Sequence, residues 1–131
     1  MKNARLMDMV KGWFVGDFDP VVYRTTGCEV AIKRYNAGDQ EERHYHRVAT
    51  ELTAVVSGTI MMFGKKWTEG DIVVVEPGES TDFHAISDTI TVVVKLPSVK
   101  DDKFVDARSL GGSGSEAEEL LHKDIFSVKS K

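Results

Sequence analysis

The chain has 131 residues, a net charge of −4 and a single cysteine, Cys28. Its length suits one domain with one buried core, and its lysines and arginines form no basic cluster with interleaved aromatic residues, which argues against nucleic-acid binding. The N-terminus has no apolar stretch of signal length, and no run of eighteen apolar residues occurs, so we expect a soluble cytoplasmic protein without a membrane partner. One cysteine excludes an intrachain disulfide and suits a reducing compartment.

The first 24 residues are too apolar for a loose tail, since they contain Trp13, Phe14, Phe18 and Tyr23. We expect one short helical turn over residues 6–10. The segment after it is expected to cover the edge of a sheet or to pair with another subunit, because either arrangement limits unwanted strand addition.

Short apolar runs separated by glycine-containing turns fill the middle of the chain. Strands are expected over residues 28–35, 52–56, 59–63, 71–76 and 90–96. Turns are expected at 36–39, at 57–58 as a tight hairpin, and at 64–66 and 69–70. Strands this short, about ten residues apart and without helical patterns between them, indicate an all-β antiparallel sandwich or barrel, with a jelly roll as the natural choice.

The end of the chain differs in composition from the middle. Residues 111–115 read as a flexible Gly/Ser linker, and Ser115 can cap a short helix over 116–123. The predicted organisation is therefore one β-barrel domain over residues 1–110, followed by a linker and a short helical tail over 111–131.

The most informative pattern is G-x5-H-x-H-x4-E-x6-G, formed by Gly38, His44, His46, Glu51 and Gly58. Two histidines two apart on a strand project to the same side and can share an ion. If residues 47–50 close a β-hairpin, Glu51 returns beside the histidine pair. Two imidazoles and one carboxylate suit non-haem iron(II), and also manganese, zinc or nickel, so the pattern predicts one divalent metal ion without naming it.

This pattern resembles the first motif of the cupin superfamily, and the resemblance covers about residues 28–97. It implies a small RmlC-like jelly roll, or double-stranded β-helix, with a ligand cavity at the barrel mouth, and it implies a homodimer. The second cupin motif departs from the family. Its strand and turn are present from Gly70 to Gly78, but Thr81 stands where the family has a histidine.

Two alignments compete for the nearest imidazole, His84. Without a gap, Thr81 takes the ligand position, and strand alternation turns Phe83 and Ala85 inward while Asp82 and His84 turn outward. With a three-residue insertion, or with a β-bulge that changes the alternation, His84 becomes a fourth ligand. We favour the gap-free alignment because it needs no insertion, and it leaves a metal site of two histidines and one carboxylate with three open positions.

The candidate substrate-binding residues are Tyr35, Thr81 and Phe83, and Lys33 and Lys95 are further candidates on the strands near the mouth. No catalytic residue is assigned from the sequence. The small-molecule substrate itself is not identified either.

Three functions are compatible with these patterns. The first is a metal-dependent enzyme of dioxygenase, isomerase or lyase type that acts on a small oxygenated metabolite. The second is a non-catalytic module that binds a small ligand for sensing, storage or regulation, which the missing histidine of the second motif supports. The third is a metal-free sugar-nucleotide isomerase or epimerase, as some related jelly-roll enzymes are, and the intact H-x-H with its glutamate argues against it.

Overall fold

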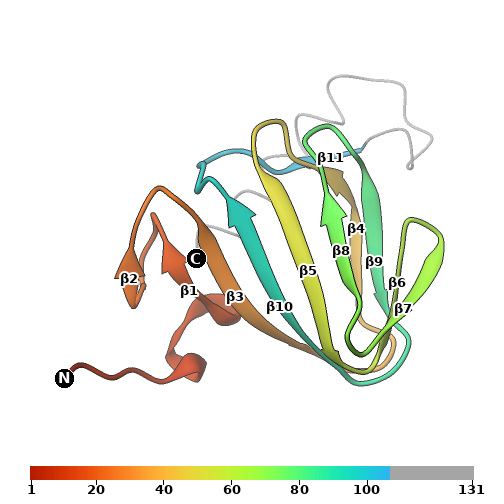
Figure 1. The fold of residues 1–131 in the computed structure, drawn as a ribbon, viewed down its shortest axis with the longest axis horizontal. Helices are drawn as coiled ribbons and strands as arrows, with labels where there is room; N and C mark the ends of the chain where they lie inside the picture. Colours follow the sequence, from red (N-terminus) through yellow and green to blue (C-terminus); the bar gives the residue numbers. More distant parts are fainter. Residues whose placement is uncertain (107–131) are drawn as a thin grey trace.

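The computed structural model describes residues 1–106, whose strands form two facing sheets (Figure 1). The six-stranded sheet has the order β2-β1-β3-β10-β5-β8, and the five-stranded sheet has the order β11-β4-β9-β6-β7. Neighbouring strands run antiparallel, except that β1 and β2 run parallel. This architecture is the all-β jelly roll expected from the sequence.

Two short 3-10 turns, η1 (Leu6–Asp8) and η2 (Val10–Gly12), precede the strands where one helical turn was expected. The strands are β1 (Trp13–Gly16), β2 (Tyr23–Arg24), β3 (Glu29–Tyr35), β4 (Gln40–Tyr45), β5 (Thr50–Ser57), β6 (Thr59–Met62), β7 (Lys65–Thr68), β8 (Ile72–Val75), β9 (Thr81–Ala85), β10 (Thr89–Leu96) and β11 (Phe104–Val105). The expected linker and helix over 111–123 lie outside the described residues. In the part of the chain that is described, no helix is long and apolar enough to span a membrane.

The turn between β6 and β7 is shorter than expected. Phe63 and Gly64 both have positive φ, 54° and 67°, which is typical of the two-residue turns that close β-hairpins. Lys65 and Lys66 therefore begin β7 instead of forming the turn.

Two connections that were expected to be hairpins instead cross between the sheets. β4 belongs to the five-stranded sheet and β5 to the six-stranded sheet, and β6 is back in the five-stranded sheet. The predictions of hairpins at residues 47–50 and at 57–58 are wrong, because the strands on either side of each connection face one another across the sandwich instead of pairing. The first crossing places the end of β4 opposite the beginning of β5.

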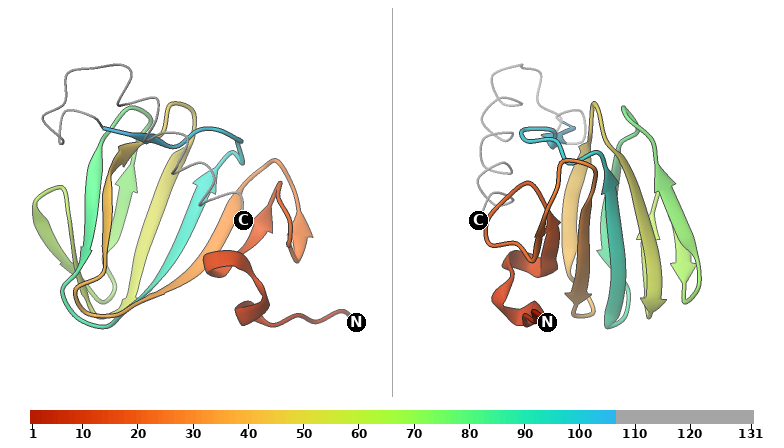
Figure 2. Two further views of the ribbon diagram at one scale, coloured as in Figure 1. Left: turned by 180° about the vertical axis from the view of Figure 1, so that it is seen from behind. Right: turned by 60° about the vertical axis from the view of Figure 1, so that its left-hand side comes forward.

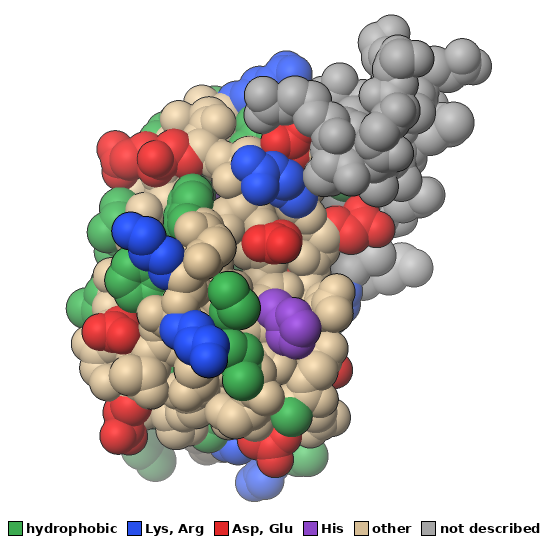
Figure 3. All heavy atoms as spheres, turned by 90° about the vertical axis from the view of Figure 1, so that its right-hand side faces the viewer, with side chains coloured by type: hydrophobic (Ala, Val, Ile, Leu, Met, Phe, Trp, Pro, Cys, Tyr) green, Lys and Arg blue, Asp and Glu red, His purple; other side chains and the backbone are tan. Residues whose placement is uncertain are grey.

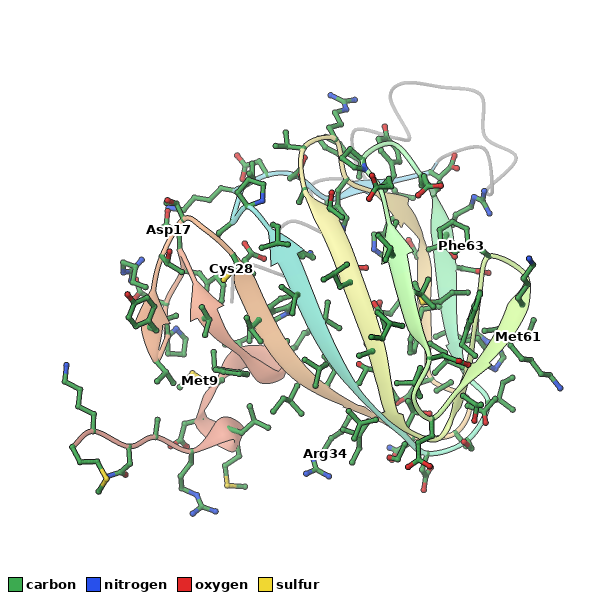
Figure 4. All side chains as sticks on the ribbon, viewed as in Figure 1. Met9, Asp17, Cys28, Arg34, Met61 and Phe63 are labelled. Carbon is green, nitrogen blue, oxygen red and sulfur yellow. The ribbon has the colours of Figure 1, made fainter. Side chains whose placement is uncertain are left out.

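Side chains from the two sheets meet between the layers, whereas Arg34 of β3 points away from them (Figure 4). One buried apolar cluster consists of Val55, Ile60, Met62, Val73, Val75, Phe83 and Ala85. A second cluster consists of Trp13, Ala31 and Val93, with Phe18 packed against it. Members of both clusters line a cavity in the interior.

The chain after β10 closes one end of the sandwich. Seen from behind, it crosses that end to reach β11, which pairs with β4 (Figure 2). The side chain of Asp102 lies on this crossing and accepts hydrogen bonds from the backbone N–H groups of Arg47, Val48 and Ala49, at 3.0, 3.1 and 2.9 Å. One carboxylate, on the segment that follows β10, therefore fixes the connection between β4 and β5.

Candidate metal centre

Two buried histidines have their ring orientation set by backbone carbonyl groups. The Nδ1 atom of His44 lies 2.8 Å from the carbonyl oxygen of Glu42, and the Nδ1 atom of His46 lies 2.8 Å from that of Asp102. A carbonyl oxygen only accepts hydrogen bonds, so each Nδ1 atom bears the proton and each Nε2 atom bears a lone pair. Both imidazoles are therefore in the tautomer that binds a metal through Nε2.

Glu51 approaches the histidines from the opposite sheet. Its Oε1 atom is 3.7 Å from Nε2 of His46 and 3.9 Å from Nζ of Lys95. Among the described residues, Nε2 of His46 has no hydrogen-bond partner although it is buried. A nitrogen lone pair and a carboxylate oxygen thus face each other with no proton between them, and a bound cation would stabilise both.

The spacing of the three side chains is slightly wider than metal binding requires. Two donors bound to one ion at about 2.1 Å lie roughly 3.0–3.4 Å apart, less than the 3.7 Å between His46 and Glu51. The rings of His44 and His46 are 5.5 Å apart between centroids. Within residues 1–106, no group of three His, Cys, Asp or Glu side chains is spaced to hold an ion as it stands. The donor chemistry fits a divalent ion, and the side chains must move inward to bind one.

The protonation states of the site suit metal binding at neutral pH. Burial alone would raise the pKa of Glu51, but a proton or cation at Nε2 of His46, together with the Lys95 ammonium, outweighs burial and holds that pKa below its usual range. Burial, followed by the charge of Lys103, lowers the pKa of His44 to about 4. The carboxylate is therefore charged and His44 is neutral, as metal ligands must be.

The side chain of Thr81 points inward but is already engaged. Thr81 lies opposite His44 in the pairing of β4 with β9. Its hydroxyl accepts a hydrogen bond from the N–H of Phe63 at 2.8 Å and donates one to the carbonyl oxygen of Asp82 at 2.8 Å. The hydroxyl thus holds two backbone groups beside the histidines.

His84 lies on the other face of the same strand. Along β9, Thr81, Phe83 and Ala85 are buried, whereas Asp82 is exposed and His84 is partly exposed. A histidine appears on the molecular surface over β6, β7 and β9 (Figure 3), and of the three histidines in residues 1–106 only His84 is not buried. The structure therefore brings together His44, His46 and Glu51 and leaves His84 apart from them.

The three candidate substrate-binding residues line a cavity of about 80 Å³ next to His44 and Glu51. The ring of Tyr35 packs on that of Phe83, with 4.4 Å between centroids. Its hydroxyl donates to Oε2 of Glu41 at 3.0 Å. Burial first, and then the Glu41 carboxylate, raise the pKa of Tyr35, so this hydroxyl stays protonated and fixed beside the cavity.

A groove of about 990 Å³ beneath the N-terminal 3-10 turns adjoins this cavity, and Lys11, Lys33, Tyr35 and Glu41 line both. The N-terminal segment, expected to cover a sheet edge, thus borders the route from solvent to the cavity.

Sequence reasoning missed several residues of the site, among them Glu41 and Asp102. Alternation along β4 turns Glu41 to the face opposite His44, but a register irregularity between them brings Glu41 to the cavity side, as a β-bulge does. Asp102 is 56 residues from His46, and no spacing rule connects the two. The contact of Glu41 with Tyr35 could be anticipated only with knowledge of the strand register.

No protein-family model and no curated protein matches the chain. Solved structures do match. A protein with a double-stranded β-helix domain from Klebsiella pneumoniae is 22% identical with a TM-score of 0.53, covering 56% of this chain and 66% of that one. KdgF from Halomonas sp. is 18% identical with a TM-score of 0.53, covering 59% and 76%.

The DMSP lyase DddQ from Ruegeria pomeroyi is 14% identical with a TM-score of 0.60, covering 76% of this chain and 54% of the lyase. This chain therefore spans about half of the lyase and about two thirds of the Klebsiella protein. At sequence identities this low, the structural matches show a shared fold and nothing more. The chain thus has a double-stranded β-helix fold, the fold that the resemblance of its first motif implies.

Proposed function

We propose that the chain is a metal-binding protein of the cupin type that acts on a small oxygenated metabolite at a centre formed by His44, His46 and Glu51. The observation behind the proposal is the buried Nε2 atom of His46, which faces Oε1 of Glu51 at 3.7 Å and lacks a hydrogen-bond partner among residues 1–106. Two buried hydrogen-bond acceptors that face each other are stabilised when a cation lies between them.

When bound, a divalent ion supplies a Lewis acid that polarises a substrate oxygen. The chain itself supplies orientation and a small cavity with some apolar walls. The carbonyl groups of Glu42 and Asp102 fix the two imidazole rings, and such hydrogen bonds to metal-binding histidines set both ring orientation and ligand basicity. Met62 and Phe83 form buried apolar walls of the cavity, which favours exclusion of water from a bound substrate. The lyase named among the structural neighbours supports only the view that this fold can host an enzyme.

A non-catalytic ligand-binding role is the second candidate. It is favoured by Thr81, whose hydroxyl at the position of the expected fourth ligand is already engaged by two backbone groups. Turnover of a bound metabolite would separate an enzyme from a binding module that uses the same centre.

The proposal is tested by the metal content of the purified protein. We expect about one divalent ion per chain in the unmodified protein and none in the double variant His44→Ala, His46→Ala, measured by elemental analysis after removal of loosely bound metal. The matched control is His84→Ala, which removes an imidazole from the outer face of β9 and should leave the metal content unchanged. Equal metal content in the unmodified protein and the double variant would refute the proposed centre.

A further inference from the structure

The inner face of β3 and β10 places a basic and a hydroxyl side chain side by side in the cavity. Lys33 and Thr91 are cross-strand partners in the pairing of these strands, and both line the cavity. The Nζ atom of Lys33 lies 5.4 Å from the centroid of the Trp13 ring. The indole therefore supports the lysine stem and directs its ammonium group along the cavity wall.

The hydroxyl group of Thr91 is buried in the wall of the cavity without a partner within residues 1–106. Thr91 is fully buried, and its Oγ1 atom has no hydrogen-bond partner among the residues that the structure describes. Leaving a buried hydroxyl without a partner destabilises the folded chain. A ligand oxygen or a water molecule in the cavity would remove this penalty.

The cavity also has an excess of positive charge. Its lining includes four lysines, at positions 11, 33, 95 and 103, against the three carboxylates of Glu41, Glu51 and Asp82. Lys11 and Asp82 are both exposed, which leaves three lysines against two carboxylates, and a divalent ion on Glu51 would add two further positive charges. Buried charge is tolerated only when it is compensated, so the loaded site needs an anion.

The ion pair between Lys33 and Glu41 compensates the charge of Lys33 only in part. Its Nζ atom is 3.9 Å from Oε2 of Glu41, beyond hydrogen-bond distance, and the same oxygen already accepts the hydroxyl of Tyr35 at 3.0 Å. Burial lowers the pKa of Lys33 although Glu41 opposes this shift, and Lys103 and Lys11 add to it. An anion beside Lys33 would stabilise its ammonium form.

We propose that the substrate is a small carboxylic acid whose carboxylate binds Lys33 and Thr91 while a second oxygen, from a hydroxyl, keto or further carboxyl group, faces the metal centre. This assignment of substrate class rests on the proposed function. The cavity of about 80 Å³ suits an acid of a few carbon atoms, since pockets for drug-sized ligands measure about 300–1,000 Å³. A carboxylate is planar and smaller than a phosphate, so it suits a cavity of this size.

Binding of oxalate, pyruvate and inorganic phosphate to the metal-loaded protein, measured by isothermal titration calorimetry, tests this assignment. We expect oxalate and pyruvate to bind more tightly than phosphate. Lys33→Met retains the aliphatic stem on Trp13 and should weaken oxalate binding by about tenfold or more, and Thr91→Val should weaken it several-fold, since charge-assisted hydrogen bonds are the stronger kind. Lys66→Met, which removes an exposed lysine of β7, should bind as the unmodified protein does.

Metal content and thermal unfolding of each variant are measured in parallel, so that the two proposals can fail separately. A protein without metal would refute the proposed centre. A metal-loaded and folded protein that binds neither acid, or whose Lys33→Met variant binds oxalate unchanged, would overturn the substrate class alone. Tighter binding of phosphate than of either acid would also overturn it.

Discussion

Asp102 shows how one residue outside the predicted motif can govern the site. Its carboxylate accepts N–H groups of the connection between β4 and β5, and its carbonyl oxygen holds Nδ1 of His46. The same residue therefore fixes the loop and the imidazole ring. Residues of this kind are as important to a metal site as its ligands, because they set the direction in which the ligand lone pairs point.

Replacing this carboxylate tests its role. Asp102→Asn turns one acceptor oxygen into an amide donor that faces backbone N–H groups. We expect the variant to lose about 1–3 kcal/mol of unfolding free energy and about tenfold or more in metal affinity, measured by urea denaturation and by competition with a chelator. Asp101→Asn, the same change at the neighbouring exposed position, should leave both quantities nearly unchanged. Identical behaviour of the two variants would show that Asp102 does not organise the site.

At the scale of elements, both glycines of the motif lie in connections that cross between the sheets, and the two connections differ in how closely they are packed. Gly58 joins β5 to β6 with φ of 91°, and a Cβ atom there would lie 2.3 Å from the carbonyl oxygen of Asp88. Gly38, the other glycine of the motif, has φ of 94° but open space around it. The two glycines therefore share a backbone requirement, and only Gly58 also has a packing requirement.

Alanine substitutions at Gly38 and Gly58 should distinguish the backbone requirement from the packing requirement. Gly38→Ala should lose about 1–2 kcal/mol of unfolding free energy, the cost of a side chain in left-handed backbone. Gly58→Ala should lose clearly more, or fail to fold, because its methyl group would also collide with the chain near Asp88. Urea denaturation of both variants measures the difference, and equal losses would contradict the close approach seen at Gly58.

Five strands, β3, β5, β6, β8 and β10, could be predicted from the sequence, because each contains a short run rich in apolar residues. The sheet to which each strand belongs could not. The spacing from His46 to Glu51 limits their distance along the chain, but a hairpin and a crossing between sheets satisfy the same spacing. The inward position of Thr81 follows from simple alternation along its strand. The position of Glu41 on the cavity side depends instead on the irregularity in β4. Contacts such as that between Asp102 and His46 arise only from the folded chain.

At the scale of the whole molecule, the outer face of the six-stranded sheet is apolar. Outward positions of neighbouring strands align in register, with Leu52 opposite Val74 and Ala54 opposite Ile72. Ile72 and Val74 are 63% and 49% exposed, and Val56 of β5 is exposed as well. β10, β5 and β8 lie next to one another in Figure 1, so the surface is continuous. Monomers rarely expose such faces.

We propose that a second copy of the chain covers this face. A two-fold interface brings the same patch of both subunits together, so a charged patch would repel itself, whereas this uncharged one is compatible with its own copy. We expect a dimer in sedimentation velocity measurements, and Val74→Glu should shift it to monomer by placing two carboxylates at the interface. Lys66→Glu, on the other sheet, is the control. A monomeric unmodified protein would refute the proposed dimer.

The position of the candidate ligands on opposite sheets has a mechanical consequence. His44 and His46 belong to the chain at the end of β4, and Glu51 belongs to β5 across the sandwich. An ion held by all three would tie the two layers together, in the way that a disulfide does in secreted domains. A chain with one cysteine cannot form such a bond by itself. Loss of the ion would then loosen the layers together with the chemistry, because binding to the folded state alone adds to its stability.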